Sequence, residues 1–526
     1  MSKTFSGWIL RTAKRQVNLL QEGKRSYSQC LQRRGQARWR RAHSGSAAAR
    51  LCSPPLCSSD RSYRHTAEDV RYQLLPQQIN DLLRANEQSV KMADGEGRNR
   101  GTVLKMESNI LASNSPCEDR RSAATCLQTK GNLFGIFDGH AGAACAQSVS
   151  ERLFYYIAVS LMPQGTLEEI EFAREHMKPV LPILQWYKHK NDYMPREMAS
   201  LYVDHLRVFW QELIELDNGS GMSVADAMAY AFQRLDSDIS LEAQHYTDNE
   251  FIKNLALEIA FSGSTACVSH IDGVHLHLAN CGDCRAVLGV QDEGGAWSGV
   301  PLTEDHNAFN LSELQRVRSE HPEEEDVVSD CRLLGLLMPL RAFGDVRFKW
   351  SQGLQKSVLH GACNAEPLNI YQYSPTNYHT PPYLTATPEV TYHKLRPQDK
   401  FLIMASDGLW DFLDNQEAVR LVAEHLSDIR EPRISMGKRS LGTMHNLLLQ
   451  RRSSGIHRPD PNVATHLIRN AVGTNEDGEL DQERLAAMLS LPEDLSRMYR
   501  DDITVTVIYF NSSAIEAQYQ DGEQRR

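Results

Sequence analysis

Three aspartates adjoin short, strongly apolar runs of the chain. They are Asp138 after residues 133–137, Asp407 after residues 401–405 and Asp501 before residues 503–510. If these runs are neighbouring strands, the three carboxylates can meet at one edge. Buried like charges are costly unless a cation neutralises them, and oxygen-only ligands favour Mg²⁺ or Mn²⁺ over zinc or copper. The pattern therefore indicates a metal site, with a turn residue as the alternative for each aspartate alone.

The elements that must position these aspartates combine hairpin-like strands with helices. Two β-rich runs, 266–269 and 274–279, flank a turn at Asp272 and Gly273 and predict a hairpin. Helical periodicity is predicted in residues 76–90, 141–162, 198–215, 224–240 and 416–425. Because strands and helices follow no regular βαβ order, the sequence favours an α+β fold with antiparallel sheets.

The charge of the chain is unevenly distributed. The 526 residues have a formal net charge of -10, but residues 1–66 contain 14 Lys and Arg against two acids, so the rest carries -22. A body this acidic argues against general nucleic-acid binding, which requires clustered cationic side chains. The basic, Ser-rich leader is typical of a mitochondrial transit peptide, with a solvated basic tail as the alternative. The sequence has no apolar run of about 18 residues, so it predicts no transmembrane segment.

The cysteines and the low-complexity stretches predict neither a disulfide framework nor further domains. Eleven cysteines at irregular spacing do not resemble a disulfide scaffold. Cys281 and Cys284 form a lone CxxC without the second pair that a structural zinc site needs, so packing at a strand end is the preferred interpretation. The Pro-, Tyr- and Asn-rich stretches 361–383 and 431–461 are interpreted as insertions.

Seven motifs occur in a fixed order between residues 106 and 510. They are Cys117-Glu118-Asp119, Phe137-Asp138-Gly139-His140, Phe261-Ser262-Gly263-Ser264-Thr265, Asn280-Cys281-Gly282-Asp283, Arg341-Ala342-Phe343-Gly344-Asp345, Ser406-Asp407-Gly408 and Asp501-Asp502-Ile503-Thr504. This series resembles the metal-dependent PPM (type 2C) protein phosphatases. The resemblance implies a sandwich of two antiparallel β-sheets flanked by helices on both sides, and hydrolysis of phosphoserine or phosphothreonine. It divides the chain into a leader (1–66), a linker or docking segment (67–105), the phosphatase domain (106–510) and a tail (511–526).

The resemblance also implies a role for each residue of the site. Two Mg²⁺ or Mn²⁺ ions would be bound by Asp138, Gly139, Asp407, Asp501 and Glu118. The ions would hold a water as hydroxide for attack on the phosphorus, and Asp119 would hold metal-bound water. His140 would give a proton to the serine oxygen. Asp283 and Asp345 are candidates for a third metal site or for hydrogen bonds to the ligands.

One position departs from the family pattern. Many relatives place a phosphate-binding Arg five residues before the position of Asp119, but this chain has Asn114 there. An asparagine can donate a hydrogen bond yet lacks the charge and the two-pronged geometry of Arg, so Asn114 would be a weak phosphate ligand. Phosphate binding would then depend on the metals, on Arg120 or Arg121, or on docking elsewhere.

Several segments resemble one subgroup, the mitochondrial pyruvate dehydrogenase phosphatases, and the second of its isoforms more than the first. They are residues 8–10, 118–123, 150–156, 498–502 and 502–507. The subgroup implies a location in the mitochondrial matrix and the phosphorylated E1α subunit of pyruvate dehydrogenase as substrate, which regains activity on dephosphorylation. It implies the lipoyl domain of the E2 core and a regulatory subunit as partners.

Three other functions can be weighed against this one. One is a phosphatase of another mitochondrial 2-oxoacid dehydrogenase complex, such as the branched-chain complex, which the catalytic motifs cannot distinguish. Another is an inert pseudophosphatase scaffold, against which the complete set of metal-binding carboxylates argues. A cysteine-based phosphatase is excluded because none of the cysteines has an Arg six positions later.

Overall fold

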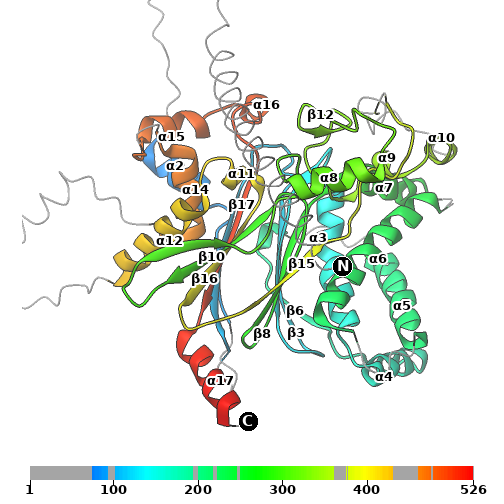
Figure 1. Ribbon diagram of the computed structural model, residues 1–526, viewed down its shortest axis with the longest axis horizontal. Helices are drawn as coiled ribbons and strands as arrows, with labels where there is room; N and C mark the ends of the chain where they lie inside the picture. Colours follow the sequence, from blue (N-terminus) through cyan, green and yellow to red (C-terminus); the bar gives the residue numbers. More distant parts are fainter. Residues whose placement is uncertain are drawn as a thin grey trace, which may run out of the picture. The chain divides into compact units, whose positions relative to one another are not determined.

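The computed structural model describes residues 74–92, 101–192, 199–216, 222–245, 249–360, 375, 377–430, 460–475 and 478–524. Most of its strands form two six-stranded sheets in which all neighbours are antiparallel (Figure 1). The first sheet has the order β1 (Gln88–Lys91), β2 (Val103–Leu111), β17 (Ile503–Phe510), β16 (Asp399–Ala405), β10 (Arg285–Gln291) and β11 (Trp297–Pro301). The second has the order β15 (Glu389–Lys394), β9 (His275–Cys281), β8 (Ala266–Asp272), β4 (Asn132–Phe137), β3 (Arg120–Cys126) and β6 (Leu184–Trp186).

The two sheets face each other across an apolar core. Phe134 of β4 and Leu276 of β9 pack in this core with Met404 of β16. The next side chain along β16, Ile403, points the other way and packs with helices on the outer face of the first sheet. Successive side chains of a strand alternate between its faces, so a strand with an unbroken apolar run, such as residues 401–405 of β16, must be buried on both.

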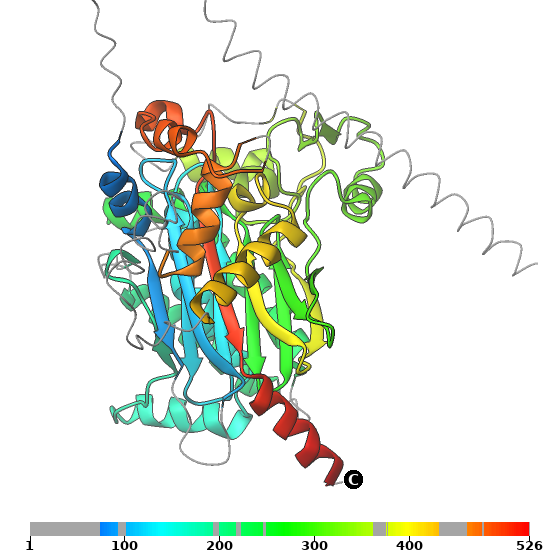
Figure 2. The same cartoon turned by 90° about the vertical axis from the view of Figure 1, so that its left-hand side faces the viewer.

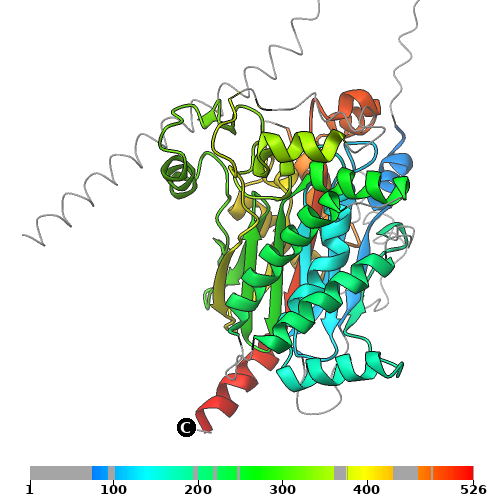
Figure 3. The same ribbon diagram turned by 90° about the vertical axis from the view of Figure 1, so that its right-hand side faces the viewer.

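Helices cover the outer face of each sheet. On the second sheet α3 contacts β3 and β4, and α6 contacts β9 and β15; Figure 3 shows this layer in front of the strands. The helices of this side are α3 (Ala144–Ser160), α4 (Gln164–Glu175), α5 (Ala199–Glu215), α6 (Val224–Gln244) and α7 (Glu250–Phe261). On the first sheet (Figure 2) lie α2 (Pro76–Arg84), α12 (Asn415–Arg430), α14 (Val463–Gly473) and α15 (Gln482–Leu489). The predicted α+β sandwich with helices on both sides is confirmed.

Shorter elements complete the described chain. Three two-residue strands form a small sheet in the order β14 (Phe343–Gly344), β7 (Gly263–Ser264) and β5 (Gly139–His140). The others are η1 (Lys190–Asp192), α8 (Leu311–Glu320), β12 (Val328–Ser329), β13 (Arg332–Leu333), α9 (Val346–Lys349), α10 (Gln352–His360), α11 (Asp407–Trp410), α16 (Glu493–Ser496) and α17 (Ser512–Gln524). Among the helices that the structure describes, none has the length and apolar character needed to cross a bilayer.

The segment between the leader and the predicted domain differs from expectation. The predicted helix 76–90 ends at Arg84, and residues 88–91 instead form β1, which pairs with β2. Ile79 and Leu83 of α2 are buried under the first sheet. From Leu74 onward the described chain therefore belongs to the sandwich, and within the predicted linker or docking segment α2 and β1 both pack on the first sheet.

The C-terminal segment also packs on the domain. Ile515 of α17 is buried in the core between the sheets, and the Tyr519 hydroxyl donates to the carbonyl of Leu395 (3.0 Å). The predicted tail 511–526 thus includes a helix that closes one end of the sandwich. The predicted leader 1–66 lies outside the described residues, as do residues 361–374 and 431–459 of the predicted insertions.

Candidate active site

Strand pairing brings the predicted residues to the same end of neighbouring strands in each sheet. In the first sheet Ala405 pairs with Val505, so Asp407 follows β16 at the end where Asp501 precedes β17. In the second sheet the start of β3 lies opposite the end of β4. The residues that flank these two ends are Glu118, Asp119 and Asp138.

Carboxylates from the two sheets are close enough to repel one another. Burial raises the pKa of Asp138 well above its ordinary value, and four carboxylates raise it further, those of Asp119, Asp407, Asp283 and Asp501. Burial and neighbouring carboxylates likewise raise the pKa of Asp407 and raise that of Asp119 to about 8. Such a cluster is stabilised when a proton or a cation enters it.

The side chains of this cluster are gathered but do not form a closed ligand set. In the described part of the chain, no three His, Cys, Asp or Glu side chains are grouped so that they could hold a metal ion. The donors at the edge are nevertheless all oxygens, which suits a hard divalent cation. The structure therefore brings the predicted ligands to one place without arranging three of them around a single point.

Asp502 fixes the loop that carries Glu118. Its Oδ1 accepts hydrogen bonds from the backbone N–H groups of Ser113 (2.5 Å) and Asn114 (2.8 Å). Its Oδ2 accepts from the backbone N–H of Glu118 (2.7 Å) and from Asn114 Nδ2 (2.9 Å). Asp502 is buried, so these bonds replace the solvation that its carboxylate loses. They hold the start of β17 to the loop before β3.

Both carboxylate oxygens of Glu118 have partners. Oε1 accepts from the backbone N–H of Gly142 (2.6 Å), and Oε2 lies 3.2 Å from Arg497 Nη1. Burial raises the pKa of Glu118, although Arg497 and the Gly142 N–H act in the opposite direction. Gly142 has a φ of 120°, a conformation that residues with a side chain rarely adopt, so a glycine is needed to aim this N–H.

Asp119 is tied to the loop that carries Asp407. Its Oδ2 accepts a hydrogen bond from Ser406 Oγ (2.7 Å), and the same Oγ accepts from the backbone N–H of Thr504 (2.9 Å). Asp119, Ser406 and Thr504 are all buried. One hydroxyl therefore connects residues of β17, of the loop after β16 and of the segment before β3.

Two glycines of the Asp-Gly pairs permit close backbone contact rather than a turn. Neither Gly139 nor Gly408 has a positive φ. A Cβ on Gly139 would collide with the carbonyl of Glu118, and a Cβ on Gly408 would collide with that of Asp502. The alternative interpretation, that these pairs are ordinary turns, does not explain the glycines.

His140 is held by an aspartate from a distant loop. Its Nε2 lies 2.5 Å from Asp345 Oδ2, and the side chain of Asp345 is 1% exposed. A Cβ on Gly263, which lies beside both, would come well under 3.0 Å from each of these two atoms. The small sheet of β5, β7 and β14 thus brings the imidazole and the carboxylate together across a glycine.

Comparisons with known proteins agree with this geometry. The protein phosphatase 2C family model matches residues 188–439. Human mitochondrial pyruvate dehydrogenase (acetyl-transferring) phosphatase 2 is 56% identical over 99% of this chain and 100% of its own. This chain belongs to the protein phosphatase 2C family. Rat mitochondrial pyruvate dehydrogenase phosphatase 1 is also 56% identical, over 88% of this chain and 87% of its own. A protein phosphatase 2C homologue of Schizosaccharomyces pombe is 31% identical, over 79% and 82%.

The two remaining predicted aspartates, Asp345 and Asp283, have different surroundings in this member of the family. Asp345 is hydrogen-bonded to His140, which is not one of the predicted metal ligands. Asp283 follows Gly282, whose N–H donates to His306 Nδ1 (3.1 Å). Burial, and after it the carboxylate of Asp305, raises the pKa of Asp283 to about 7. Asp283 also raises the pKa of Asp407, so it lies near the cluster.

In this phosphatase 2C the three candidate phosphate ligands donate hydrogen bonds to groups of the protein itself. The Asn114 amide donates to Asp502 (2.9 Å) and Asp501 (3.4 Å). Arg120 donates to Gln147 and to the carbonyls of Cys117 and Asp119. Arg121 donates to Ser108 and to the carbonyl of Asn86, and its side chain is 4% exposed. The structure therefore gives no support to the prediction that Arg120 or Arg121 binds phosphate.

Four residues of the site were missed by the sequence interpretation. They are Gly263, Ser406, Arg497 and Asp502. Gly263, Ser406 and Asp502 lie inside the family motifs, and their positions in those motifs are the sequence signal that could have identified them. Arg497 gives no such signal, because an isolated Arg in a polar segment resembles a surface charge.

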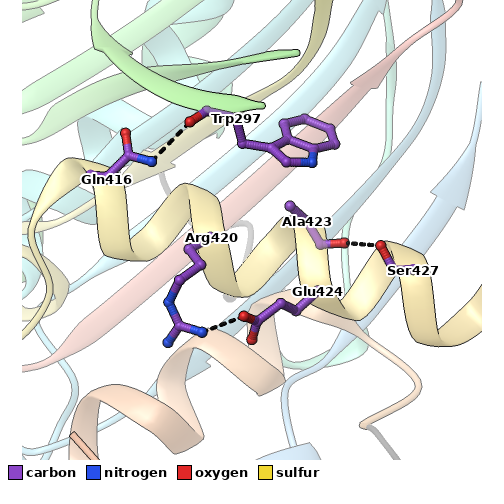
Figure 4. A pocket seen from close by; sticks show the side chains of 6 residues that line it. All are labelled: Trp297, Gln416, Arg420, Ala423, Glu424 and Ser427. Atoms are coloured by element: carbon purple, nitrogen blue, oxygen red, sulfur yellow. Dashed lines mark hydrogen bonds and ion pairs between the residues drawn. The ribbon is translucent and has the colours of Figure 1, made fainter. Parts of the chain in front are cut away.

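Other features lie apart from this cluster. Cys281 and Cys284 are both buried, as packing at a strand end predicts. A groove between β11 and α12 (Figure 4) is lined by Trp297, Gln416, Arg420, Ala423, Glu424 and Ser427. Arg420 pairs with Glu417 and Glu424 of its own helix. No predicted site residue lines the groove.

Proposed function

We propose that this chain is a metal-dependent protein serine/threonine phosphatase that dephosphorylates the E1α subunit of the mitochondrial pyruvate dehydrogenase complex and so reactivates it. The observation that carries the proposal is the 56% identity, over almost the whole chain, to a mitochondrial phosphatase named for that substrate. The buried carboxylate cluster beside His140 supports the same reaction, because phosphate ester hydrolysis needs positive charge and a proton donor at one place.

We propose that the cluster binds hard divalent cations, two ions of Mg²⁺ or Mn²⁺. The donors are oxygens, and the raised pKa values of Asp138 and Asp407 identify a site that gains from positive charge. The residues that would hold the ions are Asp138, the carbonyl of Gly139, Glu118, Asp407 and Asp501, with Asp119 acting through water. When bound, the ions would screen the phosphate and acidify a water for in-line attack.

His140 is the proposed proton donor to the serine oxygen. Its Nε2 is bonded to Asp345, so Nδ1 is the ring nitrogen left to face the leaving oxygen. Burial by itself would lower the pKa of His140, but the carboxylates of Asp345, Asp283 and Glu118 together outweigh it, and the pKa is raised above its ordinary value. A raised pKa favours the protonated ring, which is the form that a general acid requires.

The same proposal includes the location, the domain limits and the partners of the enzyme. The leader, residues 1–66, would direct the chain to the mitochondrial matrix. The phosphatase domain, residues 106–510, would be extended by α2 and β1 before it and by α17 after it. The E2 lipoyl domain and a regulatory subunit are the partners that the resemblance supports, and the stretches 361–383 and 431–461 are where partner contacts would differ between relatives.

The test compares two phosphorylated complexes as substrates. The full-length protein is incubated with phosphorylated pyruvate dehydrogenase complex, or with phosphorylated branched-chain 2-oxoacid dehydrogenase complex, in Mg²⁺ or Mn²⁺. Phosphate release and recovery of dehydrogenase activity are measured, with chelator as the control. We expect faster recovery of pyruvate dehydrogenase. Faster recovery of the branched-chain complex would reassign the substrate. No phosphate release from either complex would refute the proposed phosphatase activity.

A further inference from the structure

The protein lacks a guanidinium at the position where many relatives bind phosphate. Asn114 occupies that position, and its amide is bonded to Asp501 and Asp502. The nearest sequence neighbours, Arg120 and Arg121, donate to protein groups. A phosphate dianion bound beside a carboxylate cluster would still gain from a two-pronged cationic donor.

Arg497 lies beside the cluster and reaches solvent. Its Nη1 is 3.2 Å from Glu118 Oε2, and its side chain is 55% exposed whereas that of Glu118 is 9% exposed. A guanidinium has five N–H donors, and this ion pair uses one. Glu118 in turn influences the pKa of His140, so the carboxylate that Arg497 pairs with lies within electrostatic range of the proposed proton donor.

The backbone around Arg497 is anchored rather than left as a surface loop. It follows α16 directly, and Ser496 Oγ donates to the carbonyl of Ser113 (2.7 Å). Ser113 Oγ donates in return to the carbonyl of Arg500 (2.8 Å). The turn from 496 to 500 is thus attached to the loop that carries Asn114, at the same end of the sandwich as α11 (Figure 1). Asn114, at the position of the family arginine, and Arg497 therefore lie on two segments that are hydrogen-bonded to each other.

A second arginine in the turn does not offer the same access. Arg500 is 6% exposed, and its Nε and Nη1 have no hydrogen-bond partner among the described residues. Its charge faces Asp502 and Asp501. Arg500 therefore offsets buried negative charge, whereas Arg497 can meet a ligand that arrives from solvent.

We propose that Arg497 binds the substrate phosphate in place of the arginine that Asn114 replaces. The inference rests on the proposed phosphatase function. Nη1 keeps its bond to Glu118, and the remaining N–H groups donate to phosphate oxygens. Arg497 thus supplies the positive charge beside the phosphate from a different position in the sequence than the arginine of the relatives.

The experiment compares Arg497→Gln and Arg497→Lys with wild type, and uses Arg420→Gln as the matched control. Arg420 is an exposed arginine on α12 that, like Arg497, pairs with glutamate. We measure kcat and KM for a phosphoserine peptide, the inhibition constant of inorganic phosphate, and the Mg²⁺ or Mn²⁺ concentration for half-maximal activity. Binding of inorganic phosphate is measured separately by calorimetry.

Arg497→Gln is expected to raise KM and weaken phosphate binding about tenfold, with a smaller change in kcat. Arg497→Lys should recover part of the loss because it keeps the charge but not the two-pronged geometry, and Arg420→Gln should match wild type. Unchanged phosphate binding with a shifted metal requirement would overturn the proposal and make Arg497 a partner of Glu118 only. Absence of turnover in wild type would instead refute the proposed function.

Discussion

His140 Nε2 and Asp345 Oδ2 lie 2.5 Å apart although the residues are 205 positions apart in the chain. Asp345 adopts a left-handed backbone conformation, with φ of 50°, and its N–H donates to the carbonyl of Ser262 (2.9 Å). A non-glycine residue in this region carries strain that its surroundings must offset. The loop is therefore built to present this carboxylate to the imidazole.

Removing the imidazole should affect the leaving group. We expect His140→Ala to lower kcat on a phosphoserine peptide by about 10²- to 10⁴-fold, and Asp345→Asn to lower it less. The loss should be much smaller with p-nitrophenyl phosphate, whose leaving oxygen needs no proton. The two substrates are compared at saturating metal. An equal loss on both substrates would argue that His140 supports the metal ligands instead.

Neutralising the central carboxylate should separate stability from activity. In Asp138→Asn one of several mutually repelling buried charges is lost, so the metal-free protein should melt at a higher temperature than wild type. Metal-stimulated dephosphorylation should be abolished. Mg²⁺ or Mn²⁺ at about 100 times its dissociation constant should stabilise wild type by about 2.7 kcal/mol and leave the variant unchanged, as measured by thermal unfolding. Near-normal turnover in the variant would refute the metal assignment.

A single methyl group should disturb the pairing of His140 with Asp345. In Gly263→Ala the new Cβ would lie well under 3.0 Å from both polar atoms, so we expect a large fall in kcat. Gly165→Ala is the matched control, because a Cβ there meets no atom within 4 Å and alanine favours the helix. Peptide turnover and far-UV circular dichroism are measured for both. Full activity in Gly263→Ala would show that the contact is dispensable.

Acid should destabilise the fold through His306. Its Nδ1 accepts from the Gly282 N–H and Nε2 lies 3.3 Å from Glu389, an arrangement that suits the neutral ring. Burial, and after it Arg341, lowers the pKa of His306 to about 4. The unfolded chain, with a His pKa of about 6.5, binds the extra proton first. Stability from this group is therefore complete above pH 6.5 and is lost as the pH falls from there towards 4.

The size of this effect can be measured by urea unfolding. At pH 5 the loss relative to pH 7 should be about 2 kcal/mol from this group. His306→Asn can still accept from Gly282 but does not titrate, so its free energy of unfolding should fall less between pH 7 and pH 5. An identical fall in the variant would assign the acid sensitivity to other groups.

The strands that carry the site were predictable, whereas the edge of the sheet was not. The strands β4, β16 and β17 are built mainly of apolar and β-branched residues next to acids, and burial on both faces leaves that signature. By contrast, β1 has the sequence Gln-Ser-Val-Lys and alternates between half-buried and exposed positions. A short edge strand of this kind gives no apolar pattern, so its residues were assigned to a helix.

Contacts between distant segments account for what the sequence interpretation missed at the site. Asp502 was noticed only as the neighbour of Asp501, because its partner Asn114 lies 388 residues away. Gly139 was weighed as a turn residue, but it is a glycine because the carbonyl of Glu118 comes close to it. Local spacing encodes secondary structure; it does not encode which loops meet.

The position of β17 in the first sheet determines when that sheet can be completed during folding. This strand pairs along its length with both β2 and β16, and Ser108 Oγ bonds to the carbonyl of Val505, 397 residues later. During synthesis β17 emerges after every other strand that the structure describes. Without β17 the first sheet loses the strand that joins β2 to β16, and the proposed site lacks Asp501. Contacts of such long sequence separation form slowly, and a chain truncated before residue 501 should be inactive rather than partly active.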